Sequence, residues 1–305
     1  MLIGFAIIGV VILIGYVVGR FGVLGEHAPR VISRMVFFVL SPCLLFTVLA
    51  DADVHTLFSS TLVVSAIAAL LSILLFLGIS LFVFRRKLPE AMIGSLSAGY
   101  VNANNIGIPV AVYVLGDPAY SAPVILLQLL VLAPISLTIL DVATNGRTTF
   151  WRTVLRPFAN PLIIGSALGT IVAVTGLELP APVMEPFRII GAAAVPLVLI
   201  AFGMSLHGRR RGDAVGTSRR DVALASSIKL AVMPLIAWVF GALVFQLGDA
   251  ELFAVVVLAG LPTAQNIFVY AQRYDRGIAV ARDTVLLTTI GAVPVLVLVA
   301  AILAP

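Results

Sequence analysis

NANNIGIPV, residues 102–110, is the stretch that decides the fold of this chain, together with its counterpart LPTAQNIF at 261–268. Both combine amide side chains with a proline, which lacks a backbone N–H and interrupts helical hydrogen bonding. In the first stretch Pro109 frees the carbonyl of Asn105, and Gly107 loosens the helix further. Polar groups within an apolar segment survive only inside protein or beside a water-filled cavity. We therefore expect two broken helices within a membrane.

The composition of the chain identifies lipid as its solvent. Of its 305 residues, 61% are hydrophobic and 11% are charged, and the mean hydropathy is +1.16. A soluble domain is about half apolar and about a quarter charged. The net charge of +5 comes from short basic clusters between apolar runs. These clusters are typical of the charged side of a membrane protein, so we expect no nucleic-acid partner.

Apolar runs of about 20 residues, the length that crosses a bilayer, recur along the whole chain. The sequence predicts an all-α polytopic membrane protein with ten transmembrane helices and no soluble domain between them. The predicted spans lie near 2–19, 30–50, 59–84, 90–115, 119–141, 157–176, 183–206, 221–247, 250–272 and 278–303.

The charged residues predict the orientation of these spans. Basic residues gather on the odd-numbered connections, as at 85–87, and acidic residues gather on the even-numbered ones, as at Asp51 and Asp117. The positive-inside rule places the odd connections in the cytoplasm. We therefore expect a multi-pass protein of the cell (inner) membrane, with its N- and C-termini outside.

Ten spans divide into two halves of five, and an odd number of spans gives the halves opposite orientations. We expect a first five-helix repeat at 1–145, a cytoplasmic connection at 146–156, and a second, inverted repeat at 157–305. The broken helices are then the fourth and the ninth. Helix-breaking segments in corresponding positions of two halves point to the binding site of an inverted-repeat transporter.

The polar residues of the two broken helices form the candidate substrate site. Half-helix N-termini carry partial positive charge and free N–H groups, which suit a carboxylate. Amide side chains donate or accept hydrogen bonds, so they hold an anion or coordinate a cation equally well. A plainer interpretation is that these amides only join helices to one another. The candidates are Asn102, Asn104, Asn105, Pro109, Pro262, Gln265 and Asn266, with Lys229 added for its charge.

Lys229 is the only basic residue well inside a predicted span, roughly 12 Å from the start of that span at 1.5 Å per residue. One interpretation is that it snorkels to the interface. Otherwise it needs a partner, either as a counter-charge for an anion or as a fixed positive charge where a related carrier would hold a cation. No Asp or Glu falls in the middle of a span, which disfavours a carboxylate proton relay and a cationic substrate. Gln128, a lone amide within a span, fits packing better than binding.

The sequence contains no enzyme signature. It has no phosphate-binding loop and no plausible Ser/His/Asp set, and its three histidines lie far apart. Cys43 is the single cysteine, so no intrachain disulfide forms. We expect no enzymatic activity, no cofactor and no metal site.

Four segments resemble the auxin efflux carrier family, in its bacterial branch, and the likeness runs along nearly the whole chain. They are RMVFFVLSPCLLF at 34–46, NANNIGIPV at 102–110, GAAAVPLVLIAFGMSL at 191–206 and LPTAQNIFVYAQRY at 261–274. The resemblance implies a scaffold of helices one, two, six and seven, a moving part made of the others, and alternating access. It also implies that Asn105, Pro109, Pro262 and Asn266 are crossover residues, and that a dicarboxylate such as malonate or malate, which bacterial members carry, is a candidate substrate. The short middle connection differs from the long cytoplasmic loop of many plant members, which disfavours auxin itself.

These features together predict a permease for a small organic anion, a carboxylate above all, held at the crossover of helices four and nine. Two alternatives remain open at this point. One is a sodium- or proton-coupled antiporter or symporter of the same fold, and the other is a non-cycling channel or sensor. The expected partners are the organic anion, the lipid bilayer and, where coupling occurs, an ion, while a homodimer is also left open.

Overall fold

The computed structural model describes residues 2–25, 27–51, 60–145, 161–206 and 219–304, and these residues are helical with no β-strand. The predicted all-α fold is confirmed for this part of the chain. Six of the described helices are long and apolar enough to cross a membrane, whereas the count of ten and the inverted repeat stay predictions. The predicted connection at 146–156 lies outside the described residues. The six helices are Val31–Ala50, Ser60–Val83, Pro118–Thr144, Ala181–Met204, Arg219–Val244 and Ile278–Leu303.

The helices form two compact units, each of which takes segments from both halves of the chain. The first unit holds the described residues of 1–58, 104–123 and 155–212, and the second holds those of 59–103, 124–154 and 213–305. Predicted spans one, two, six and seven therefore group together, as the family resemblance implies for a scaffold. The segment 104–123 joins them.

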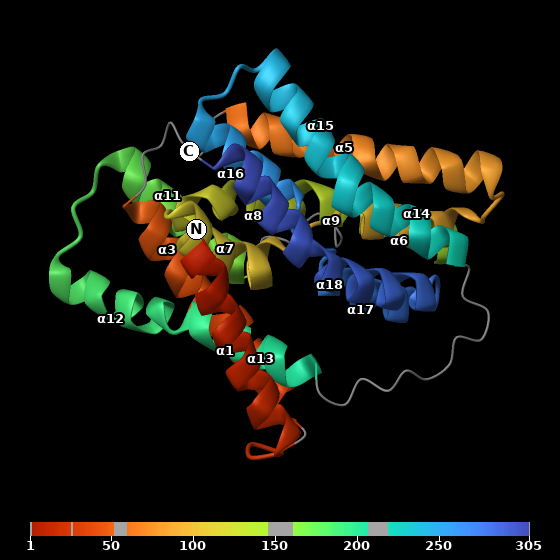
Figure 1. The fold of residues 1–305 in the computed structure, drawn as a ribbon. Helices are drawn as coiled ribbons and strands as arrows, with labels where there is room; N and C mark the ends of the chain where they lie inside the picture. Colours follow the sequence, from red (N-terminus) through yellow and green to blue (C-terminus); the bar gives the residue numbers. More distant parts are fainter. Residues whose placement is uncertain (1, 26, 52–59, 146–160, 207–218, 305) are drawn as a thin grey trace. The chain divides into compact units, whose positions relative to one another are not determined.

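The first unit is built from two pairs of closely packed helices, α1 against α13 and α3 against α11 (Figure 1). Its elements also include short π-helical and 3-10 turns, which carry the letter η. The elements are α1 (Leu2–Arg20), α2 (Ala28–Met35), η1 (Val36–Leu40), α3 (Ser41–Ala50), α7 (Ile108–Val110), η4 (Ala111–Leu115), η5 (Pro118–Ser121), α11 (Pro161–Thr175), α12 (Ala181–Ala192) and α13 (Ala194–Leu206).

Glycines bring the backbones of these helix pairs into contact. Gly203 of α13 faces the backbone of α1 at Ile12 and Tyr16, and Gly165 of α11 faces the backbone of α3 at Pro42. A side chain at either glycine would collide with that backbone. Small residues of this kind are typical of helix interfaces in membranes, where close van der Waals packing replaces the hydrophobic effect.

The second unit contains Ser60–Val83, Arg219–Val244 and Ile278–Leu303 of the long helices, and these pack against two shorter helices, α6 and α16. The π turn η3 (Ala103–Gly107) and the helix α8 (Ala122–Leu127) lie where the chain passes from one unit to the other. The other elements are α5 (Ser60–Gly78), η2 (Ile79–Val83), α6 (Leu88–Gly99), η6 (Gln128–Leu132), α9 (Ala133–Asn145), α14 (Arg219–Ser227), η8 (Ile228–Val232), α15 (Met233–Val239), η9 (Phe240–Val244), α16 (Asp249–Ala259), α17 (Gln265–Tyr274) and α18 (Ile278–Leu303).

Two helical hairpins of the second unit have turns with the same backbone geometry. A π turn ends each first helix, and a residue with positive φ follows: Arg85 at 52° before α6, and Gln246 at 50° before α16. These two residues stand 161 positions apart (246 − 85). The helices α6 and α16 therefore begin in the same local geometry. Matching backbone bonds of 2.9 Å close both turns, from Arg86 N to Ser80 O and from Leu247 N to Gly241 O.

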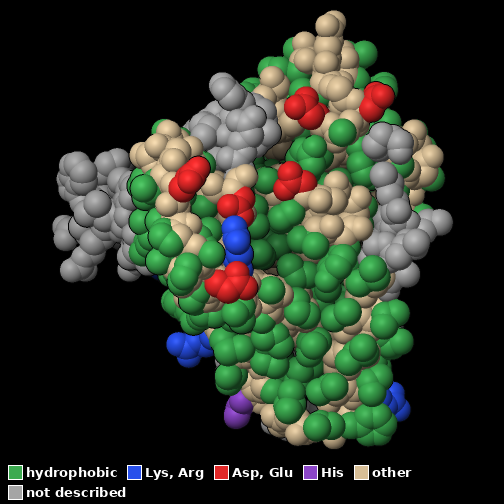
Figure 2. Space-filling model, turned by 90° about the vertical axis from the view of Figure 1, so that its left-hand side faces the viewer, with side chains coloured by type: hydrophobic (Ala, Val, Ile, Leu, Met, Phe, Trp, Pro, Cys, Tyr) green, Lys and Arg blue, Asp and Glu red, His purple; other side chains and the backbone are tan. Residues whose placement is uncertain are grey.

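Large hydrophobic side chains cover the outside of the long helices. In the second unit Phe82 is 83% exposed, and Leu243 and Ile290 are each 65% exposed. Figure 2 shows, on one face, a broad hydrophobic area in the lower part of the view, below a group of charged side chains. Scattered apolar residues are normal on a soluble protein, but helices of this length with such surfaces match the hydrocarbon core of a bilayer.

Candidate functional site

The helices α6 and α16 end beside each other, and the chain segments that follow them cross. Val101 and Thr263 form an antiparallel bridge. The backbone N–H of Asn102 donates to the carbonyl of Pro262 at 2.8 Å, and that of Ala264 donates to the carbonyl of Tyr100 at 3.0 Å. The two non-helical segments therefore pair some of each other's backbone N–H and carbonyl groups. Buried backbone groups require such partners.

The first broken helix is interrupted earlier than the sequence indicated. Tyr100 has extended geometry, with φ −103° and ψ 105°, while Pro109 lies inside the short helix α7 and follows the π turn η3. The expected break at Gly107 and Pro109 is therefore wrong in position. The chain is continuously helical from Ala103 to Leu115, and Pro109 follows the π turn within it, so the helix is not interrupted at this proline. The extended residues at 100–102 instead gain the hydrogen bonds of the crossing.

Neutral groups donate to carbonyls at the end of α6 and just beyond it. The Thr263 hydroxyl donates to the carbonyl of Ser97 at 2.6 Å, and the Gln128 amide donates to the carbonyl of Val101 at 2.8 Å. The Thr263 N–H donates to the hydroxyl of Thr288 at 3.1 Å. These bonds join α6, η6 and α18 to the segment that precedes α17. They therefore stabilise the crossing.

A charged group caps the end of α16. The ammonium of Lys229, in the π turn η8, donates to the carbonyl of Ala259 at 2.6 Å and lies 3.2 Å from the sulfur of Met233. Lys229 is 0% exposed. The four ion pairs found in the described part of the chain do not include it. Snorkelling to the interface is therefore wrong for this side chain, because its charge ends inside the protein.

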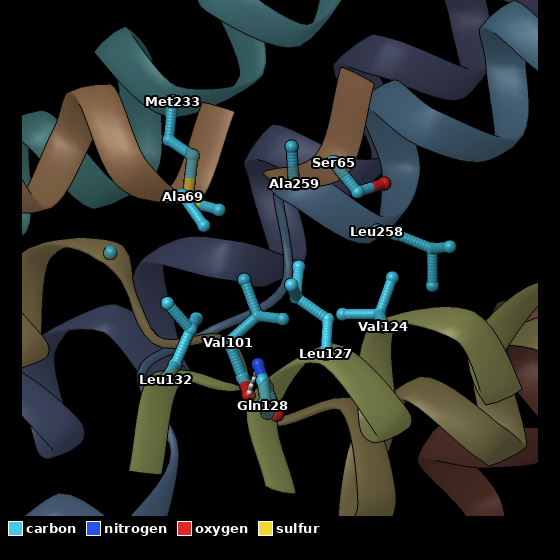
Figure 3. A pocket seen from close by; sticks show the side chains of 11 residues that line it. Ser65, Ala69, Val101, Val124, Leu127, Gln128, Leu132, Met233, Leu258 and Ala259 are labelled. Atoms are coloured by element: carbon cyan, nitrogen blue, oxygen red, sulfur yellow. Dashed lines mark hydrogen bonds between the residues drawn. The ribbon is translucent and has the colours of Figure 1, made fainter. Parts of the chain in front are cut away.

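A small recess lies next to this charged cap in the second unit (Figure 3). Met233 and Ala259, the two residues that contact the Lys229 ammonium, form part of its wall, and Gln128 forms another part. The volume open to the centre of a water molecule is about 10 Å³, close to the room that one water needs. The lining residues are Ser65, Ala69, Gly99, Val101, Val124, Leu127, Gln128, Leu132, Met233, Leu258 and Ala259.

The predicted site residues fall into both units. In the second unit Asn102 and Pro262 meet at the crossing, while Gln265 and Asn266 begin α17, with Asn266 exposed. In the first unit lie Asn104, Asn105 and Pro109. There the Asn104 amide nitrogen donates to the side-chain oxygen of Asn105 at 3.0 Å. The Asn104 side-chain oxygen is buried and accepts no hydrogen bond within the described residues.

Sequence reasoning missed the residues that fasten the crossing. Gln128 was expected to pack, and it does so by holding the Val101 carbonyl, as the dashed line in Figure 3 marks. Thr263 belongs to the predicted second break but was not among the candidate site residues, and its bond to Ser97 was not expected. Nothing in the sequence indicated Ala259. No group of three or more His, Cys, Asp or Glu side chains that could hold a metal occurs in the described part of the chain.

Comparison with known proteins identifies the family of the chain. The family model described as "Membrane transport protein" matches residues 2–149 and 147–300. The chain belongs to this family. It is the auxin efflux carrier family that the four sequence motifs resemble. Because the family and its relatives are transporters, the chain is a multi-pass membrane transporter and not an enzyme.

Three relatives illustrate the range of the family. The "Putative malonate transporter" of Rhizobium meliloti is 25% identical over 92% of this chain and 88% of its own. An "Uncharacterized transporter" of Methanothermobacter thermautotrophicus is 28% identical over 92% and 91%. The "Uncharacterized transporter YfdV" of Escherichia coli K12 is 23% identical over 87% and 86%. These similarities extend over nearly the full length of each protein.

Proposed function

We propose that this protein is a secondary transporter of a small organic anion, a carboxylate, which binds at the crossing of the two broken helices and moves by alternating access. The observation that carries the proposal is the crossing at 100–102 and 261–264, with a buried ammonium fastened to one of its helix ends. Discontinuous helices of this kind form the substrate sites of many secondary transporters.

The electrostatics of the crossing favour an anion. Lys229 brings a positive charge into the second unit, and the described acidic residues of that unit stand near helix ends, as Glu90, Asp141 and Asp221 do. A fixed charge in a medium of low dielectric acts over a longer range than one in water. A carboxylate therefore gains from the potential of Lys229 without touching it.

The amide side chains would supply the direct contacts. Asn102, Asn104, Asn105, Gln265 and Asn266 donate to a carboxylate through their NH₂ groups. Pro109 lies in α7 and Pro262 in the crossing, and both lack a backbone N–H, so neither competes with a substrate as a donor. The unsatisfied oxygen of Asn104 adds an acceptor for a hydroxyl or a water carried with the substrate.

The proposed architecture has ten spans in two inverted repeats, 1–145 and 157–305, with both termini outside the inner membrane. The repeated turns at Arg85 and Gln246 support such a repeat, because they give α6 and α16 the same entry. The division into two units, each with helices from both halves, supports movement of one rigid part against another.

Dicarboxylates such as malonate are the first substrates to test, because one relative carries malonate in its name. Purified protein in liposomes is assayed for uptake of labelled malonate and malate, and for counterflow, which a channel does not show. Asn105→Ala and Asn266→Ala are each expected to lower uptake by about 10-fold or more, since a hydrogen bond to a charged group contributes about 1.5–3 kcal/mol.

Gln246→Gly is the matched control, because it removes an amide from an exposed turn whose φ already suits glycine. It should leave uptake unchanged. If both asparagine variants fold normally and transport as well as the wild type, the site assignment is wrong. Anion-dependent uptake that saturates but requires sodium would favour the coupled alternative.

A further inference from the structure

Tyr100 and Tyr270 form a pair of phenols in the second unit that the proposed site does not use. Tyr100 directly follows α6, is 1% exposed, and its carbonyl accepts from Ala264 at the crossing. Tyr270 lies in α17, is half-buried, and packs against the core cluster that contains Tyr100. The hydroxyls of the two side chains are hydrogen-bonded to each other. The pair therefore ties α17 to the end of α6.

Burial decides which hydroxyl of the pair is the donor. A hydroxyl has one O–H group to donate and two lone pairs that accept. Because Tyr100 is sealed from water, its O–H needs an acceptor inside the protein, and the oxygen of Tyr270 is that acceptor. The O–H of Tyr270 is then not consumed by the pair. The half-buried phenol therefore keeps a donor for a third group.

The place of Tyr270 on α17 brings this donor close to the proposed substrate site. Asn266 and Tyr270 stand four residues apart on one helix, so they share a face, with Cβ atoms about 5–6 Å apart. Asn266 is exposed. Arg273, almost one turn further along, is also exposed and interacts electrostatically with the Tyr270 hydroxyl. This face of α17 thus offers an amide donor, a phenol donor and a positive charge, all of which suit an anion.

We propose that the Tyr270 hydroxyl is a second anchor of the substrate site, which holds the far end of an anion bound through its carboxylate at Asn266. The site then selects anions with two acceptor groups, because two donors on one helix face each take one end of a short dicarboxylate. This inference rests on the proposed function and adds a specificity-determining residue to the same site. An analogue that lacks the second acceptor is rejected, because it leaves a donor of the site without a partner.

The other phenol of the pair provides the matched control. Tyr100→Phe and Tyr270→Phe both remove the hydrogen bond between the two hydroxyls, but only Tyr270→Phe removes the donor offered to the anion. A pair that served only to hold α17 against α6 would make both variants alike in their binding. Heat stability is not the readout, because Tyr270→Phe also leaves the buried Tyr100 hydroxyl without its acceptor. The preference for dicarboxylates over monocarboxylates is the quantity that a structural role would not change.

The test measures the binding of malonate, succinate and propionate to the purified wild type and to both variants by isothermal titration calorimetry. The wild type should bind a dicarboxylate more tightly than propionate. Tyr270→Phe should weaken dicarboxylate binding by about 10-fold or more, as the loss of a hydrogen bond to a charged group does. Propionate binding in this variant, and the binding of all three anions in Tyr100→Phe, should stay within about 3-fold of the wild type, because no donor to the anion is lost there.

Several outcomes would overturn the inference. They are a wild type without preference for dicarboxylates, equal losses in both variants, and a Tyr270→Phe variant that keeps its dicarboxylate affinity or loses it together with that for propionate. If Tyr270→Phe does not fold, the double variant Tyr100→Phe/Tyr270→Phe, which leaves no phenol unpaired, is compared with Tyr100→Phe and decides in the same way. A wild type that binds none of the three anions would contradict the proposed function and this inference with it. A wild type that binds them with a selectivity independent of Tyr270 would contradict this inference alone.

Discussion

The ends of α6 and α16 differ in one respect that the backbone does not explain. Both helices begin after a turn of the same type, and both end at the crossing. At each end, side chains from elsewhere in the unit donate to the last carbonyls or to those just beyond. At α6 the donors are neutral, and at α16 the donor is Lys229. The comparison teaches that the same backbone arrangement can be capped by a neutral donor or by a charged one. Both donors satisfy a carbonyl, but only the charged donor adds an electrostatic potential.

The largest expected effect comes from removing the charge with Lys229→Met, which nearly keeps the volume of the side chain. Anion affinity should fall by about 10-fold or more, because a charge at roughly 10 Å contributes about 1.7 kcal/mol at an effective dielectric of 20. Heat stability should stay level to within about 1–3 kcal/mol, because the desolvation cost of the buried charge disappears while the carbonyl of Ala259 loses its donor. Substrate binding and thermal unfolding, measured on one preparation, check both signs.

The change in anion affinity and the change in heat stability, taken together, distinguish a functional charge from a structural one. A lysine that serves only to hold α16 would give the reverse outcome, with lower heat stability and unchanged affinity in whatever protein still folds. Lys229→Arg keeps the positive charge, so it is the control for the loss of electrostatic potential in Lys229→Met.

The next effect is that of Gln128→Leu at the neutral end. The carbonyl of Val101 loses its side-chain donor inside the protein, and an unsatisfied buried group costs about 1–3 kcal/mol. We expect a lower melting temperature with little change in anion affinity. Thermal unfolding and substrate binding measure both, and a loss of affinity as large as that of Lys229→Met would erase the distinction between the two ends.

A smaller effect is expected for Thr263→Val, which keeps the branched shape and removes the hydroxyl that donates to Ser97. Hydrogen bonds between helices in membranes contribute about 0.6 kcal/mol on average. The variant should therefore lose about that much in free energy of unfolding, measured by denaturant titration in detergent. A loss several times greater would mean that the bonds of the crossing act as a cooperative network.

The smallest effects test the similarity of the two hairpins. Arg85→Gly and Gln246→Gly place glycine at φ values near 50°, where other residues are strained. Each should raise the free energy of unfolding by about 0.5–1 kcal/mol, and the two gains should agree because the turns share their hydrogen bonds. Unequal gains, measured in parallel unfolding curves, would show that the turns differ in the full-length protein.

The sequence predicted the crossing only in outline. Proline and amides in two matched stretches indicated broken helices, and Pro262 does lie at the second break. The first break was misplaced at Gly107 and Pro109, because local propensity favoured a proline over Tyr100. The carbonyl of Tyr100 finds its hydrogen-bond donor only in the segment 261–264, and no local pattern in the sequence predicts a partner so far along the chain.

By itself the sequence determined that this protein is helical, lies in a membrane and belongs to a transporter family, because hydropathy and motif content are properties of short segments. It also marked Lys229 as a charge that needs an explanation. Only the tertiary structure decided that this charge ends at the carbonyl of Ala259, that Gln128 holds Val101, and that each unit mixes helices of both halves. These are relations between residues distant along the chain, and packing alone fixes them.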